Sequence, residues 1–231
     1  MALANEDPGA ARDLAERWRD RGGAHPADHC YAVALIGLKQ YKEAATRLEK
    51  LAQAMVRASP ALRADVLGQA AQSWLLAGDP ARAYAADSTA LGLRPDDAGL
   101  LVDRAEAAGS AGWLDKAIAD LDRVLKADPT RIDALIYRAS AYRQLNSLDL
   151  ALDDAEHAIA LEPNAVAGLL ERGNIRRLKG DVAGAKADWE RLAQLAPDSN
   201  EAVAAKNNLA RLDSEPSVSD STSAAPAPSK P

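Results

Sequence analysis

A proline recurs every 34 residues through the middle and C-terminal parts of the chain, and this spacing constrains the fold more than any other feature. The four prolines are Pro95, Pro129, Pro163 and Pro197. Three further sets keep the same spacing: Leu67, Leu101, Leu135 and Leu169; Ala83, Ala117, Ala151 and Ala185; and Gly78, Gly112, Asn146 and Gly180. A fixed period of this length is typical of a solenoid, in which each repeat buries its apolar face only against its neighbours. We therefore expect a stacked array rather than a globule built around one pocket.

The composition favours helices throughout. Hydrophobic residues make up 48% of the 231 residues, but alanine supplies much of that share and phenylalanine is absent. Alanine has the highest helix propensity, and its small side chain lets helices pack closely. Long alternations of Val, Ile and Thr are missing, so we expect no strands and an all-α fold.

Each repeat has the pattern of two helices joined by a turn. We number the repeats from Ala64, Ala98, Ile132 and Val166. Leucine at position 4 and a small residue at position 8 lie on one helical stripe. Gly or Asn at position 15 ends the first helix, and proline at position 32 cannot continue the second. The polar residues after the prolines are well placed to cap the next helix; they are Asp96, Asn164 and Asp198.

This pattern resembles the tetratricopeptide repeat, a 34-residue helical hairpin with small residues at positions 8 and 20 and proline at position 32. The resemblance implies a right-handed superhelical solenoid of antiparallel helix hairpins. The expected parts are a disordered N-terminus at 1–7, an N-terminal capping helix at 8–24, a divergent repeat at 25–63, four regular repeats at 64–97, 98–131, 132–165 and 166–199, a C-terminal capping helix at 200–212, and a disordered Ser/Pro/Ala tail at 213–231.

Asp87 departs from the family pattern, because position 24 is usually a large apolar residue. A buried carboxylate without hydrogen bonds would be costly. We therefore expect Asp87 to turn outward or to be satisfied by Ser88 and its neighbours.

No motif in the sequence predicts catalysis. The segment from Gly180 to Lys186 lacks the spacing and the hydroxyl residue of a phosphate-binding loop, and the glycines near Ser110 do not form a nucleophile elbow. A solvated, salt-bridged helix face is the preferred interpretation of the cluster of Asp149, Asp153, Asp154 and His157. We expect no enzymatic activity and no cofactor.

A metal site is the weaker interpretation of His25, His29 and Cys30. Histidines four apart can share a metal on a helix. However, Pro26 places His25 at or before the helix start, and Cys30 is better explained as a small core residue. As the only cysteine, Cys30 cannot form an internal disulfide.

The resemblance implies that a partner binds on the concave face, through positions 2, 5, 6, 9, 12 and 13 of the first helices. The candidate partner-binding residues are Gln69, Gln72, Asp103, Glu106, Tyr137, Ser140, Arg143, Gln144, Glu171, Asn174 and Arg177. This set is polar and carries both signs of charge, with Tyr137 as an apolar anchor for an extended peptide.

One known subfamily grips C-terminal carboxylates with Lys and Asn at positions 5 and 9. Here position 5 is Gly68, Val102, Ile136 or Leu170, and only Asn174 matches at position 9. The clamp is absent from the sequence, which argues against a co-chaperone role of that kind.

The expected function is a non-enzymatic protein–protein interaction module. The alternative is a self-assembling structural scaffold, and an enzyme or metal-binding protein is less expected. The chain has 34 acidic against 28 basic residues, with the two signs interspersed, so it lacks the clustered basic charge that nucleic-acid binding requires.

We expect no membrane span, because no apolar run approaches the ~20 residues that a span needs. The N-terminus lacks the basic and apolar regions of a signal peptide, so cytoplasm is the expected location. The alternative is an exported, periplasmic form if a signal peptide has been removed before Ala4-Asn5, since Ala2-Leu3-Ala4 resembles a small-x-small cleavage site.

Overall fold

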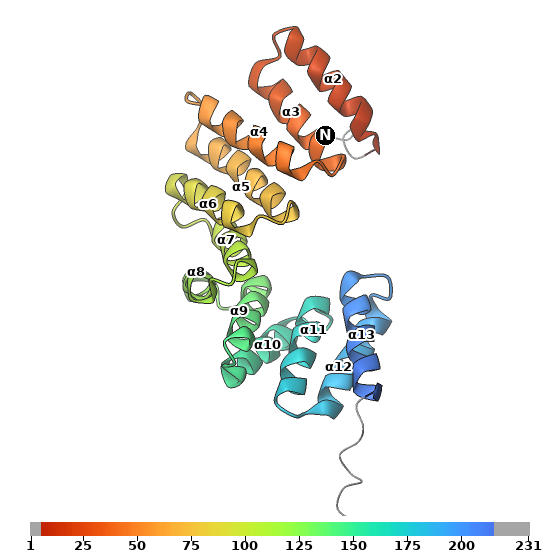
Figure 1. Cartoon of the computed structure of the whole chain (residues 1–231). Coiled ribbons are helices and arrows are strands. Elements are labelled where there is room, and N and C mark those ends of the chain that lie inside the picture. Colours follow the sequence, from red (N-terminus) through yellow and green to blue (C-terminus); the bar gives the residue numbers. More distant parts are fainter. Residues whose placement is uncertain (1–5, 215–231) are drawn as a thin grey trace, which may run out of the picture. The chain divides into compact units, whose positions relative to one another are not determined.

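A computed structural model describes residues 6–214, and all regular structure in that range is α-helical. The helices are α2 (Pro8–Asp20), α3 (Ala24–Gly37), α4 (Tyr41–Ala54), α5 (Pro60–Leu76), α6 (Pro80–Leu93), α7 (Ala98–Ser110), α8 (Leu114–Ala127), α9 (Ile132–Gln144), α10 (Leu148–Leu161), α11 (Val166–Leu178), α12 (Val182–Leu195) and α13 (Asn200–Ser214) (Figure 1). Residues 1–5 and 215–231 of the two segments predicted to be disordered lie outside the described residues. The all-α prediction is confirmed for residues 6–214.

The helices form two compact units, α2–α10 and α11–α13. In the first unit α5–α6, α7–α8 and α9–α10 are the hairpins of three regular repeats, and α3–α4 falls in the divergent segment. The first helices of these repeats also contact one another, α5 with α7 and α7 with α9. In the second unit α11–α12 is a hairpin, and α13 packs against both of its helices. No helix within residues 6–214 has the length and apolar character needed to cross a membrane.

The predicted turn residues end the first helices in the left-handed conformation. The φ angle is +75° at Gly78, +77° at Gly112, +60° at Asn146 and +85° at Gly180. Lys39 has φ +58° at the equivalent turn between α3 and α4. The sequence did not single it out, because it is neither Gly nor Asn.

The predicted helix caps are wrong by one residue. Asp97, not Asp96, caps α7 by accepting a hydrogen bond from the backbone N of Leu100 at 3.1 Å. Ser199, not Asp198, caps α13 in the same way, with Ala202 N at 3.0 Å. The loop after each proline takes two residues before the helix begins, so the second residue holds the extended backbone that a cap requires.

The residue directly after the proline has a different role in two repeats. Asp96 Oδ1 accepts a hydrogen bond from Arg123 Nη2 at 3.1 Å, and Asn164 Oδ1 accepts one from Arg191 Nη2 at 2.9 Å. Both arginines occupy position 26 of the following repeat. These bonds tie each loop to the second helix of the next hairpin.

The core consists of the periodic apolar positions. All four position-4 leucines and all four position-20 alanines are buried, at 5% exposure or less. The apolar stripes predicted from the 34-residue spacing are therefore the ones that the helices bury against their neighbours.

Position 8 of the last repeat is glycine because a tryptophan fills its space. The ring of Trp189, at position 24 of α12, is fully buried against Gly173 of α11. A Cβ atom added at Gly173 would lie 2.7 Å from Trp189 Cδ1. The three other repeats carry alanine here and a smaller residue at position 24.

We expect Gly173→Ala to destabilise the protein by about 1–3 kcal/mol, because the buried ring cannot yield without repacking. Helix propensity alone would predict the opposite change in stability, because it favours alanine over glycine by roughly 1 kcal/mol. Gly92→Ala on α6 is the matched control: no atom lies within 4 Å of its added Cβ, so it should be stabilising. Urea unfolding of both variants measures the difference, and equal effects at the two sites would contradict the packing argument.

Buried ion pairs form a second periodic feature. Arginine at position 7 donates two hydrogen bonds to aspartate at position 23 of the same hairpin, at N–O distances of 2.6–2.9 Å. The pairs are Arg104–Asp120, Arg138–Asp154 and Arg172–Asp188. The aspartates are 4–7% exposed.

These pairs correct one prediction. Asp154 does not lie on an exposed acidic face but is buried beside Arg138 of its own repeat. Arg176 also contacts the last of the three pairs, with its Nη1 atom 2.9 Å from Asp188 Oδ2. Sequence spacing alone did not reveal the pairs, since residues sixteen apart become neighbours only when the hairpin closes.

Asp87 is the clearest departure from expectation. It neither turns outward nor gains a hydrogen bond from Ser88: it is 1% exposed, and its Oδ1 atom has no hydrogen-bond partner. The Ser88 hydroxyl instead donates to the Tyr84 carbonyl at 2.7 Å. Burial, followed by the nearby charge of Asp103, raises the pKa of Asp87 to about 8.

Candidate functional site: two grooves along the first helices

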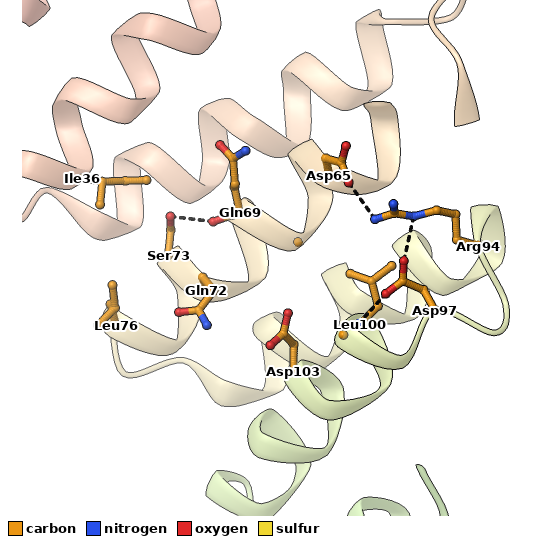
Figure 2. Close-up of a pocket in the computed structure, with 12 residues that line it drawn as sticks. Ile36, Asp65, Gln69, Gln72, Ser73, Leu76, Arg94, Asp97, Leu100 and Asp103 are labelled. Carbon is orange, nitrogen blue, oxygen red and sulfur yellow. Dashed lines mark hydrogen bonds and ion pairs between the residues drawn. The ribbon is translucent and has the colours of Figure 1, made fainter. Parts of the chain in front are cut away.

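The first unit has a groove between α5 and α7, with a volume of about 550 Å³. The side chains that line it come from α3, α5, the α6–α7 loop and α7: Ile36, Asp65, Gly68, Gln69, Gln72, Ser73, Leu76, Arg94, Asp97, Gly99, Leu100 and Asp103. We call this the α5–α7 groove. Ile36 and Leu76 supply an apolar part at one side, Leu100 lies at the other side near Asp97, and Gln72 and Asp103 lie between them (Figure 2).

Most polar groups at the ends of this groove already have partners. The Arg94 guanidinium lies between Asp65 and Asp97, with Nη2 2.7 Å from Asp65 Oδ1 and Nε 3.3 Å from Asp97 Oδ2 (Figure 2). Gln69 Oε1 is 2.8 Å from His29 Nε2 on α3. Gln72 is exposed, so its amide can meet a ligand.

A second groove, of about 400 Å³, lies between α7 and α9 and also reaches α8. Its lining is Ala105, Glu106, Gly109, Ser110, Ala117, Tyr137, Ser140, Ala141 and Gln144. We call this the α7–α9 groove. No atom lies within 4 Å of a Cβ built at Gly109, so the absence of a side chain there keeps the groove open. Arg143 Nη2 lies 3.4 Å from Ser140 Oγ at its edge.

Helix α7 contributes one carboxylate to each groove. Asp103 lines the α5–α7 groove and Glu106 lines the α7–α9 groove, three residues apart on one helix face. Burial raises the pKa of Asp103 to about 6, with further contributions from Glu106 and other neighbouring carboxylates. Burial also raises the pKa of Tyr137, together with the charge of Glu106 and a hydrogen bond to it.

The structure brings together eight of the eleven predicted binding residues in the first unit. Gln69, Gln72 and Asp103 line one groove, Glu106, Tyr137, Ser140 and Gln144 line the other, and Arg143 contacts Ser140. The other three lie on α11 of the second unit. There Glu171 is buried, Arg177 is exposed, and Asn174 Oδ1 accepts a hydrogen bond from Asn208 Nδ2 of α13 at 2.9 Å.

The sequence prediction missed several lining residues. Ile36 occupies position 12 of the divergent repeat counted from His25, and Leu76 occupies position 13 of the next, so applying the same positions there would have found both. Arg94 gave no such signal, because it belongs to the loop before the proline. Within residues 6–214, no group of three or more His, Cys, Asp or Glu is placed to hold a metal.

Comparison with solved structures identifies the fold. The chain is similar to TTC0263, described as a thermophilic TPR protein in Thermus thermophilus, with a TM-score of 0.65, 20% identity, and coverage of 81% of this chain and 100% of that one. It is also similar to MamA from Desulfovibrio magneticus, with a TM-score of 0.58, 18% identity, and coverage of 84% and 97%. No family model matches the sequence. No curated protein matches it either.

The fold defined by the helix hairpins and by these likenesses is that of the tetratricopeptide repeat. The chain therefore has the tetratricopeptide-repeat fold, as the 34-residue pattern predicts.

Proposed function

We propose that the protein is a non-enzymatic interaction module that binds an extended peptide segment of a protein partner along the α5–α7 and α7–α9 grooves. The observation that carries this proposal is the adjacency of the two grooves. Both are lined by α7, and together they contain side chains from four consecutive first helices, α3, α5, α7 and α9.

The chemistry of the lining suits a peptide. Gln72, Ser140 and Gln144 offer donors and acceptors for a peptide backbone, while the apolar part of the α5–α7 groove can take an aliphatic side chain. Volumes of 400–550 Å³ are in the range of small-ligand sites, so each groove has room for one or two residues of an extended segment.

Site-specific photo-crosslinking in the native host tests this proposal. We expect benzoylphenylalanine in place of Gln72 to capture a discrete protein partner. The same group in place of Gly92, which lies on α6 and lines neither groove, should not capture it. Filling the α7–α9 groove with Gly109→Trp should abolish the Gln72 crosslink, while Gly92→Trp should leave it unchanged.

Two results would decide against the peptide-binding role. Equal capture from Gln72 and Gly92 would show that the grooves are not the binding surface. Capture of a second copy of this chain from both sites would favour the self-assembling scaffold.

A further inference from the structure

We infer that the grooves select a basic segment: an extended peptide whose lysine or arginine side chain binds at Asp103 and Glu106 of α7, with a neighbouring aliphatic side chain held by Ile36 and Leu76. This inference rests on the proposed function and names the chemistry of its partner.

The charges that line the grooves are unbalanced. They comprise four carboxylates, of Asp65, Asp97, Asp103 and Glu106, and one cation, Arg94. The Arg94 guanidinium already forms ion pairs with Asp65 and Asp97. Among residues 6–214 no lysine or arginine forms an ion pair with Asp103 or Glu106, so neither carboxylate has a cationic partner in contact with it.

The environment of Asp103 already disfavours negative charge. Its raised pKa reflects partial burial and the surrounding carboxylates Glu106, Asp133 and Asp97, while the charge of Arg131 acts in the opposite direction. A cationic side chain would relieve this repulsion, whereas an acidic peptide would add to it. Charge complementarity therefore favours a basic partner.

The spacing of the groups fits one basic side chain. Residues three apart on a helix lie on the same face, so a single ammonium or guanidinium group can approach both carboxylates. Ile36 and Leu76 line the same α5–α7 groove as Asp103, so an aliphatic residue of the peptide would lie near the basic one.

The chain's own C-terminal segment is a poor complement to this site. Residues 215–231 contain Glu215 and Asp220 but only one basic residue, Lys230. We therefore assign the grooves to a separate partner rather than to this segment.

Selection from a library of random displayed dodecapeptides tests the inference with the full-length protein. We expect the wild-type protein to enrich peptides in which Lys or Arg neighbours Leu, Ile, Val or Met. A synthetic peptide of the enriched sequence should bind roughly tenfold more weakly to the double variant Asp103→Asn/Glu106→Gln, because a charge pair at a partly buried site commonly contributes at least this much.

The control is Asp153→Asn, which removes an exposed carboxylate from α10 outside both grooves. It changes the net charge by one unit but should leave peptide affinity within about twofold, since exposed charges contribute little. The amide substitutions at Asp103 and Glu106 are nearly isosteric, and circular dichroism melts would verify that all variants are folded.

The outcomes separate this inference from the proposed function. Enrichment of peptides without basic residues, or of Pro/Ser-rich peptides that resemble residues 215–231, would overturn the inference and leave peptide binding intact. Basic peptides that bind the double variant as tightly as the wild type would overturn the assignment to Asp103 and Glu106. Failure to enrich any peptide would overturn the proposed function together with the inference.

Discussion

Replacing Asp87 with leucine is expected to stabilise the protein by on the order of 3–5 kcal/mol at pH 7. The carboxyl is 1% exposed, its Oδ1 atom has no hydrogen-bond partner, and its pKa is raised to about 8 in the fold. At a pH where the carboxyl is ionised in the unfolded chain, each unit by which the folded-state pKa exceeds the unfolded value lowers the free energy of unfolding by up to about 1.4 kcal/mol. Leu121 occupies the same position of the next repeat and is fully buried, so the fold accepts leucine there.

The sign of the pH dependence follows from proton binding. Below pH 3.8, the ordinary pKa of an aspartate, the carboxyl is protonated in both the folded and the unfolded state, so its burial carries no ionisation cost. Between pH 3.8 and about pH 8 the unfolded chain loses the proton while the folded protein keeps it, so the stability falls as pH rises. The groups that act on Asp87 are the carboxylates Asp103, Glu106 and Asp120, which raise its pKa, and Arg104, which lowers it.

Urea unfolding at pH 5, 6.5 and 8 measures both effects. The gain from Asp87→Leu should grow with pH, and the isosteric Asp87→Asn should remove the same pH dependence. Asp153→Leu, at an exposed position of α10, is the control and should change stability by less than about 0.5 kcal/mol. A pH-independent loss of stability in Asp87→Leu would show that the carboxylate is ionised and stabilised in the fold.

Breaking a buried ion pair is expected to destabilise the protein by about as much as Asp87→Leu stabilises it. Arg138→Met should destabilise the protein by about 3–5 kcal/mol, because it leaves the buried carboxylate of Asp154 without the two hydrogen bonds from Arg138. The second partner of Arg138, Asp122, is exposed and should contribute little to this loss.

The double variant Arg138→Met/Asp154→Leu provides the critical comparison. We expect it to be within about 1 kcal/mol of the wild type, since an apolar pair of similar volume replaces a buried ion pair at little cost. The repeat at 64–97 supports this expectation, because it has buried alanines, Ala70 and Ala86, at the equivalent positions. Chemical unfolding of the two single variants and the double variant gives the coupling energy. A double variant as unstable as Arg138→Met would show that the arginine stabilises the hairpin by packing rather than by charge.

Much of the candidate site could be predicted from the repeat positions. Eight predicted residues meet in or beside two grooves, because positions 6, 9, 12 and 13 of a first helix share one face. Their partners could not be predicted in the same way. His29 meets Gln69 from forty residues away, and Arg94 joins the groove from a loop.

The sequence by itself determined the helices, their turns and the register of the repeats. These features depend on local chemistry: proline ends a helix, glycine or asparagine adopts the left-handed turn, and the apolar stripe follows the helical period. Only the tertiary structure decided that Asp154 is paired and buried, that Asp87 is buried with an unpartnered oxygen, and that Asp103 and Glu106 connect two grooves. Burial and charge pairing arise between residues brought together by helix packing, and no single repeat of the sequence contains that information.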